Sequence, residues 1–367
     1  MKKVSVKEIK KMLELTYEER NLEFVFLSGP GIGKTSIIES FFKEKGLKVA
    51  TITPSSMDRE DWKGIKTIDF GAIHNKGEKE TKLISTRPEW LNADVLFIDE
   101  ITNASKWEMT PIMKLISERQ IGEHKFNGKI IAAGNMPENS VLADVLPETI
   151  RTRLIPVVLT AEPLFYRPYF LSNKMFEVAD FIQKYVSAND FDVVSEDPYK
   201  GSANPRTLEK VGKILTKEYL SNELKETLII QTLGDGVGIK FINFLSQYLK
   251  QIDRETLKTL DEKEFVNQMK SLPFDAKVGT YKNVILNLLE GNQETIAKSL
   301  KQIESASKID VVLNEIVFEN LAILLNNAED IQNILKKLGN NVNATTSFKE
   351  IIKKIQDVQE KIKEFVI

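Results

Sequence analysis

The chain has 367 residues, of which 42% are hydrophobic and 28% are charged. This composition is that of a folded protein of two or three domains and excludes a disordered chain. Its 51 basic and 53 acidic side chains give a formal net charge of −2, which gives no reason to expect nucleic acid as a partner.

Two further classes of protein are disfavoured by what the chain lacks. Cysteine is absent, which excludes disulfides, thiolate metal sites and cysteine nucleophiles, and only two histidines are present, so we expect no histidine-based zinc site. No apolar run approaches the length of a membrane span, and the lysine-rich N-terminal segment lacks the apolar core of a signal peptide. We therefore expect a cytoplasmic protein without a membrane partner.

In chain order, the pattern predicts an α/β domain followed by helices. An amphipathic helix is expected over 5–20, and short apolar runs predict strands at 24–27, 47–53, 95–98, 129–133 and 155–159. Helical stretches separate most of these strands, which is typical of a doubly wound parallel sheet. Beyond residue 160 we expect helices, with loops at 197–205, 234–238 and 339–347. The domain boundaries are placed near 160 and 250.

A glycine-rich segment connects the first predicted strand to a predicted helix. Its residues are Gly29, Pro30, Gly31, Ile32, Gly33, Lys34, Thr35 and Ser36. Glycines allow backbone N–H groups to point at phosphate oxygens at a helix N-terminus. Lys34 is expected to reach the β- and γ-phosphates, and the Thr35 hydroxyl to bind Mg²⁺. Ser28 stands where the general pattern has glycine, and the alternative is a glycine-rich turn before an ordinary helix.

Two carboxylates follow the buried strand predicted at 95–98. The carboxyl edge of a parallel sheet is where α/β proteins bind ligands. Asp99 is therefore expected in the Mg²⁺ shell, directly or through water, and Glu100 is placed to polarise the water that attacks the γ-phosphate.

Several further segments resemble the MoxR-type and dynein-related AAA+ ATPases. They are Leu96–Asn103, Leu115–Gly122, Ile131–Asn135, Leu146–Arg153 and Asn204–Arg206, in the order that this family has. The resemblance covers roughly residues 22–250. It implies ATP hydrolysis with Mg²⁺ by an AAA+ P-loop NTPase core with a parallel sheet, followed by an all-α lid and a helical C-terminal extension. The expected domains are 1–160 with an insertion at about 66–92, the lid at 161–250, and a C-terminal region of unassigned role at 251–367.

The resemblance also implies residue roles. Asn135 would align the attacking water as sensor 1, the alternative being a turn asparagine before Met136. Arg153 would be the arginine finger that reaches a neighbouring subunit's ATP, with Arg151 as the competing candidate and a surface ion pair as the alternative for one of them. Arg206 would be the sensor-2 arginine, unless it pairs with Glu209.

The family resemblance extends to assembly and partners. It implies a homo-oligomer, expected to be a hexamer, that remodels a client protein, in some members with a separate von Willebrand factor A-domain protein. We expect the insertion at 66–92 and a hairpin at 120–129 to grip the client. Two alternatives stay open: a DNA-associated AAA+ protein acting as helicase loader or motor, and an ATP-dependent switch that turns over negligibly.

Overall fold

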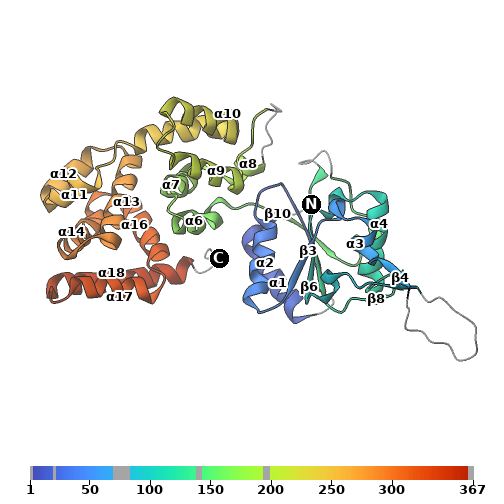
Figure 1. The fold of residues 1–367 in the computed structure, drawn as a ribbon. Coiled ribbons are helices and arrows are strands. Elements are labelled where there is room, and N and C mark those ends of the chain that lie inside the picture. The colour runs from blue at the N-terminus through green and yellow to red at the C-terminus, as the bar shows by residue number, and fades with distance from the viewer. Residues whose placement is uncertain (1–2, 20–21, 69–82, 138–142, 193–198, 363–367) are drawn as a thin grey trace, which may run out of the picture. The chain divides into compact units, whose positions relative to one another are not determined.

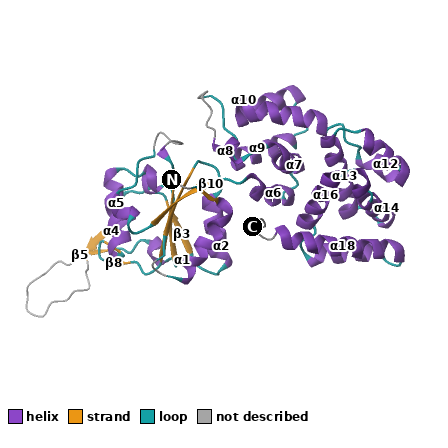
Figure 2. Cartoon of the chain, turned by 180° about the vertical axis from the view of Figure 1, so that it is seen from behind, coloured by secondary structure: helices purple, strands orange, loops and turns teal. Residues whose placement is uncertain are grey.

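The protein is described here by a computed structural model that covers residues 3–19, 22–68, 83–137, 143–192 and 199–362. The chain divides into two compact units, Met1–Ala161 and Glu162–Ile367, which are described separately (Figure 1). The strands lie in the first unit and the second is helical (Figure 2). The predicted α/β unit followed by helices is confirmed.

The first unit is built on a six-stranded sheet in which every pair is parallel. Its strands, in spatial order, are β1 (Val4–Ser5), β10 (Ile155–Thr160), β2 (Phe24–Ser28), β9 (Lys129–Asn135), β6 (Val95–Ile98) and β3 (Val49–Ile52). The prediction missed β1, because two residues carry no periodicity. It also placed a helix start at residue 5, whereas the helix α1 runs over Ile9–Glu18.

Helices cover both faces of this sheet (Figure 1). They are α1, α2 (Lys34–Glu44), α3 (Arg59–Lys63), α4 (Lys106–Glu118) and α5 (Glu148–Arg151), with 3-10 turns η1 (Val6–Glu8), η2 (Pro54–Ser56), η3 (Glu89–Asn92) and η4 (Ile101–Asn103). Leu96 and Ile98 of β6 pack with Ile112 and Leu115 of α4 in one buried core. Burial of such side chains contributes about 1.5–3 kcal/mol each, so the sheet is a rigid support for its carboxyl edge.

Two small hairpins extend from the first unit. The first pairs β4 (Lys66–Ile68) with β5 (Leu83–Ser85) at the base of the predicted insertion, and the predicted client-gripping residues between them lie outside the described residues. The second pairs β7 (Gln120–Ile121) with β8 (His124–Lys125), turning at Gly122, whose φ is +55°. The hairpin predicted at 120–129 is present but shorter, because β8 ends at Lys125 and Lys129 already belongs to β9.

The second unit consists of packed helices. They are α6 (Pro163–Ser172), α7 (Phe176–Tyr185), α8 (Ala188–Asp192), α9 (Pro205–Leu215), α10 (Asn222–Tyr248), α11 (Arg254–Thr259), α12 (Glu262–Ser271), α13 (Phe274–Glu290), α14 (Gln293–Glu304), α15 (Ala306–Ile309), α16 (Val311–Leu324), α17 (Ala328–Leu338) and α18 (Val342–Ile362). The predicted loop at 339–347 is too long, because α18 begins at Val342. Phe348, Ile351 and Ile355 of α18 are buried within this unit rather than free for a partner.

The longest helix, α10, differs from the prediction in two ways. The loop expected at 234–238 shrinks to a break at Gly234, whose φ of 76° and ψ of 165° lie outside the helical range. By length and composition alone, α10 is also long and apolar enough to cross a membrane, contrary to the expectation that no run approaches that length. Its Phe241, Phe244 and Tyr248 are buried in the core of the unit, which is how the central helix of a folded domain behaves.

A buried polar cluster lies in the core of the second unit. Arg167, 4% exposed, donates a hydrogen bond to Asn320 and lies 3.1 Å from a Glu319 oxygen. The Tyr248 hydroxyl donates to Asp180 at 2.9 Å. Charged groups this deep are costly unless they are paired, so the cluster ties α6, α7, α10 and α16 together.

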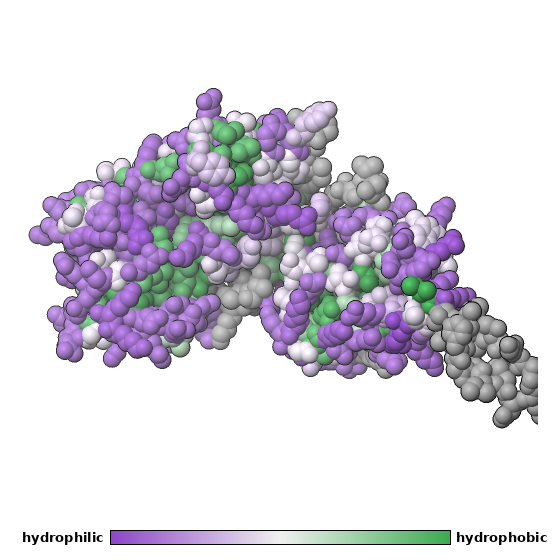
Figure 3. Space-filling model, in the orientation of Figure 1, coloured by the Kyte–Doolittle hydropathy of each residue, from purple (hydrophilic) through white to green (hydrophobic). Residues whose placement is uncertain are grey.

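The visible surface is mainly hydrophilic, with hydrophobic patches over the helices of this unit (Figure 3).

Candidate nucleotide-binding site

The phosphate loop connects the end of β2 to the start of α2. Gly31 and Gly33 have φ values of 80° and 84°, a left-handed conformation that glycine adopts without strain. Gly33 is the residue that precedes the first turn of α2, and it offers no side-chain cap. The backbone N–H groups of that turn are therefore open to a ligand, as phosphate binding at a helix N-terminus requires.

Lys34 lies folded back over its own loop and is 8% exposed. Its ammonium group donates to Ser28 Oγ at 2.7 Å, to the Gly29 carbonyl at 3.3 Å and to Asn135 Oδ1 at 3.5 Å. Ser28 also donates to the Gly29 carbonyl at 2.7 Å. The serine that departs from the general pattern thus holds the lysine, a role that the sequence analysis did not recognise.

Thr35 and Asp99 meet at the predicted metal position. The Thr35 hydroxyl donates to Asp99 Oδ2 at 2.7 Å, and Asp99 Oδ1 accepts the Glu100 backbone N–H at 2.9 Å. A hydroxyl and a carboxylate suit Mg²⁺, which takes one or two protein oxygens and completes its shell with phosphates and water. Across the described ranges, no group of three or more histidine, cysteine or acidic side chains could hold a metal ion. Because Thr35 and Asp99 supply only two oxygens, they fit a metal that takes its remaining ligands from a nucleotide and water.

Glu100 stands directly after Asp99 in an unusual backbone conformation. Its φ of 53° and ψ of 35° are left-handed, which costs a non-glycine residue about 1–3 kcal/mol. Asn103 donates its amide to Glu100 Oε2 at 3.2 Å. The carboxylate is exposed at the carboxyl edge of the sheet and held by this amide. Asn103 is a second residue that the sequence analysis missed; the local signal is its position three residues after Glu100.

Asn135 ends β9, and its side chain lies beside Lys34 of the phosphate loop. Its pairing partner in β2 is Ser28, and its backbone N–H donates to Thr102 Oγ1 at 2.9 Å. A Cβ atom at Gly134 would come within 2.6 Å of the Thr102 side chain, so glycine is required there. Thr102 thereby fixes the strand end that carries Asn135, a contact between distant segments that no sequence pattern indicated.

The two candidate finger arginines lie at the opposite edge of the sheet. Ile155, two residues after Arg153, pairs with Phe24 at the start of β2, whereas the phosphate loop follows the end of that strand. Four strand steps separate the two edges by about 13 Å. Both arginines are exposed and donate to backbone carbonyls, Arg151 to Leu146 at 3.0 Å and Arg153 to Thr149 at 3.1 Å. Neither forms an ion pair with any described residue, so the ion-pair alternative is not observed.

Arg206 belongs to the second unit, at the start of α9. Asn204 caps this helix by accepting the Thr207 N–H at 3.0 Å, which leaves Arg206 exposed in the first turn. The alternative that Arg206 pairs with Glu209 is wrong, because Glu209 pairs with Lys213. The sensor-2 role of Arg206 stays a prediction.

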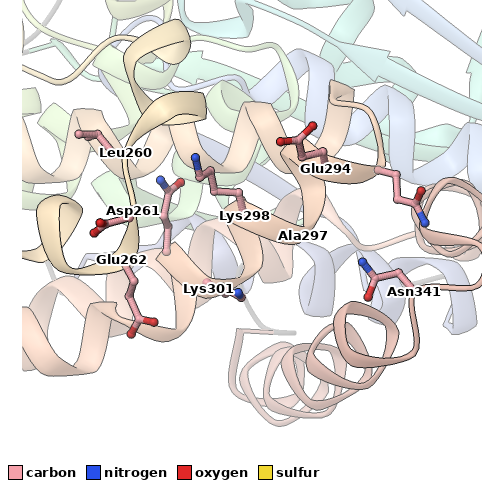
Figure 4. Close-up of a pocket in the computed structure, with 10 residues that line it drawn as sticks. Leu260, Asp261, Glu262, Glu294, Ala297, Lys298, Lys301 and Asn341 are labelled. Carbon is pink, nitrogen blue, oxygen red and sulfur yellow. The ribbon is translucent and has the colours of Figure 1, made fainter.

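A separate cavity lies among the C-terminal helices of the second unit (Figure 4). It has a volume of about 510 Å³ and is lined mainly by residues at the start of α12 and along α14, with Asn341 before α18. Its lining contains none of the predicted site residues, so it is not part of the nucleotide site.

Comparison with known proteins supports the family assignment of the first unit. Residues 24–154 match the model of the ATPase family associated with various cellular activities (AAA). No curated protein matches the chain.

Similar solved structures include the RuvB Holliday junction branch migration motor of Thermotoga maritima, with 14% identity, a TM-score of 0.31, and coverage of 83% of this chain and 78% of that one. A putative ATPase from Cytophaga hutchinsonii has 14% identity and a TM-score of 0.30, over 96% of this chain and 90% of that one. NtrX from Brucella abortus, in complex with ATP, has 13% identity and a TM-score of 0.32, over 83% and 68%. These likenesses are too weak to carry an argument about function. The family match, the phosphate loop and the parallel sheet together show that residues 24–154 form an AAA domain on an AAA+ P-loop core, which implies ATP binding and hydrolysis.

Proposed function

We propose that this protein is an ATP-hydrolysing AAA+ machine of MoxR type that assembles as a ring, expected to be a hexamer, and remodels a client protein. The observation that carries the proposal is the placement of Arg151 and Arg153 at the amino edge of the sheet. The length of β2, about 13 Å, separates this edge from the phosphate loop of the same chain. Neither arginine has an acidic partner among the described residues.

The residues at the carboxyl edge supply the first part of the reaction. The loop N–H groups and Lys34 bind the β- and γ-phosphates, while Thr35 and Asp99 hold Mg²⁺, which neutralises charge on the phosphate oxygens. Glu100 accepts the proton of the attacking water, and Asn135 orients that water. The bond from the γ-phosphorus to the bridging oxygen breaks, so ADP and phosphate are the products.

In the second part of the proposed reaction, a neighbouring subunit supplies a cation near the γ-phosphate. A guanidinium group there stabilises the charge that spreads over the transferred phosphoryl group, worth roughly 10³–10⁵ in rate in other NTPases. An exposed arginine at the opposite edge of the sheet supplies this cation if subunits pack head to tail, because one subunit's amino edge then faces the next subunit's phosphate loop. Head-to-tail contacts that close give a ring.

The client-gripping part of the proposal rests on the β7–β8 hairpin. Arg119, just before the hairpin, forms an ion pair with the buried Glu23, which also accepts the Ile130 N–H at 2.6 Å. The Phe126 N–H after the hairpin donates to the Arg119 carbonyl at 2.8 Å. The two ends of the hairpin are thus joined to each other, and Arg119 ties them to Glu23, which directly precedes β2 and bonds to β9. A client held by this hairpin would be coupled to the nucleotide through strands β2 and β9.

The test is ATP hydrolysis against protein concentration for the wild type, Arg153→Ala and Arg151→Ala. We expect specific activity to rise with concentration as rings form, and to collapse in Arg153→Ala. Activity that is constant over a range in which sedimentation shows monomers would overturn the shared site. Retained activity in Arg153→Ala with loss in Arg151→Ala would transfer the finger role to Arg151. Salt-sensitive binding of DNA fragments in the same preparations would favour the DNA-associated alternative over a protein client.

A further inference from the structure

The sheet of the first unit ends at β3 with an unpaired edge. Lys48 O accepts the Asp94 and Val95 N–H groups at 2.9 and 3.1 Å, and Ile52 O accepts the Asp99 N–H at 2.8 Å. Because alternate residues of a parallel strand face the same neighbour, residues 48, 50 and 52 bond to β6. The backbone N–H and C=O groups of Val49 and Thr51 therefore point away from the sheet, and β3 has no second neighbour among the described strands.

This edge forms one side of an open groove. The groove has a volume of about 720 Å³, and every residue from Lys48 to Thr53 lines it. Its other lining residues come from η2, α3, the base of the β4–β5 hairpin and η3. An extended chain beside β3 would thus lie in a formed channel rather than on a flat surface.

The groove is acidic. Glu60 and Asp61 of α3 and Glu89 of η3 contribute three carboxylates against the single ammonium group of Lys48. Glu60 and Glu89 are exposed, and neither carboxylate forms a hydrogen bond or ion pair with another described residue. Ile65, 62% exposed, adds an apolar side chain to the same lining.

We propose that this groove binds an extended, basic segment of a partner protein, which joins the sheet as an additional strand beside β3. The added strand satisfies the outward N–H and C=O groups of Val49 and Thr51, which is the source of affinity in strand addition. Lysine or arginine side chains on one face of that strand pair with Glu60 and Glu89, and this pairing gives specificity for a basic segment. β3 pairs with β6 at Ile52 and Ile98, one residue before Asp99, so only β3 lies between the bound strand and the strand that leads to Asp99.

The probe is a short fluorescent peptide of alternating lysine and valine, titrated into the full chain and followed by anisotropy. We expect this peptide to bind. Two comparison peptides, one with glutamate in place of lysine and one with methyl groups on alternate backbone nitrogens, should bind at least about tenfold more weakly. The first tests charge, and the second tests backbone pairing with the charge unchanged. Failure of the lysine–valine peptide to bind, or equal binding of the methylated peptide, would overturn the proposal.

Two sets of variants locate the site. Glu60→Gln/Glu89→Gln should weaken binding about tenfold, whereas the matched pair Glu44→Gln/Glu226→Gln, exposed on other helices, should leave it unchanged. Thr51→Pro removes an N–H that faces away from β6, a position at which an edge strand tolerates proline. Thr51→Pro should abolish peptide binding. The control is Thr51→Val, which removes only the hydroxyl that bonds to Glu39. ATP hydrolysis and the melting temperature should be similar in the two variants.

Amide hydrogen exchange gives a readout that charge attraction alone would not move. Bound peptide should slow exchange at Val49 and Thr51 and leave Ala50 and Ile52, already bonded to β6, as they were. Unchanged exchange at Val49 and Thr51 with saturating peptide would contradict strand addition. A second outcome would also overturn the proposal. If these two amides became protected when the chain self-associates, and Thr51→Pro abolished both the protection and the oligomer, the edge would join copies of this chain instead.

Discussion

Each unit contains a cluster of charged and polar side chains, and the two clusters differ in their access to solvent. In the first unit, Lys34, Thr35 and Asp99 bond to neighbours at the carboxyl edge of the sheet, beside the exposed Glu100. In the second unit, Arg167 and Asp180 are each 4% exposed. The open cluster can exchange its internal partners for phosphate, metal and water, whereas the closed cluster has no route for exchange. Substitutions in the open cluster should therefore change rate, and substitutions in the closed cluster should change stability.

The largest expected effect lies in the open cluster. Glu100→Gln keeps the size of the side chain and removes the proposed base, so kcat should fall by about 10²–10⁴, the range that general-base catalysis contributes. Mg·ATP binding, measured by calorimetry, and the melting temperature should stay near the wild-type values. A fall in stability comparable to the loss of rate would erase the distinction between the two clusters.

Arg167→Met tests the closed cluster. Removing the guanidinium leaves the buried Asn320 without its donor, whereas Glu319, whose side chain is 35% exposed, keeps the hydrogen bond from Gln183. We therefore expect a loss of about 3 kcal/mol, the lower end of the cost of breaking a buried pair. Chemical denaturation should show this loss in the free energy of unfolding, while kcat per folded molecule stays unchanged. Leu324→Met, a volume-conserving change on α16, is the control and should cost less than about 1.5 kcal/mol. If Arg167→Met matched this control in stability and lost activity instead, the cluster would belong to the functional machinery.

Asp180 gives the closed cluster a pH dependence. Burial raises the pKa of this carboxyl from 3.8 to about 6, against the opposing effects of Arg167 and of the Tyr248 hydrogen bond. The folded state therefore holds the proton more tightly than the unfolded state. The resulting stability is complete below about pH 4 and is lost as the pH rises through about 6; at 1.36 kcal/mol per pKa unit it amounts to about 3 kcal/mol.

The measurement is the free energy of unfolding between pH 4 and pH 7 for the wild type and Asp180→Asn. The wild type should lose stability relative to the variant as the pH rises, because the asparagine amide stays neutral. Parallel curves for the two proteins would mean that Asp180 titrates as it does in the unfolded chain.

The smallest expected effect is at Ser28. Ser28→Ala removes one acceptor of the Lys34 ammonium group, and a single hydrogen bond contributes about 0.5–1.5 kcal/mol. We expect KM for ATP to change by no more than about tenfold, with kcat nearly unchanged. A loss of kcat as large as that in Glu100→Gln would show that Ser28 acts in the chemical step.

The sequence predicted the parts of the fold and site that local pattern encodes. The strand at 95–98 and the phosphate loop were placed correctly, because an apolar run and glycines before a helix are short-range signals. The break at Gly234 was predicted to be a full loop, because several glycines close together have low helix propensity. In the structure, tertiary packing outweighs this propensity, and the helix continues after the break. Thr102 was missed for a related reason: it supports Asn135 across 33 residues of chain, and no periodicity records such a contact.

The central claim, that a neighbouring subunit completes the site, is tested most directly by mixing two inactive variants. Glu100→Gln lacks the proposed base and keeps the arginines, while Arg153→Ala keeps Glu100 and lacks the proposed finger. In rings assembled at random from equal amounts, about a quarter of the sites combine an intact Glu100 with a neighbour's intact Arg153. The account predicts that the mixture recovers about a quarter of the wild-type rate, and that a Glu100→Gln/Arg153→Ala double variant mixed with either single variant recovers none. A mixture no more active than its separate components, with subunit exchange demonstrated, would contradict the shared site.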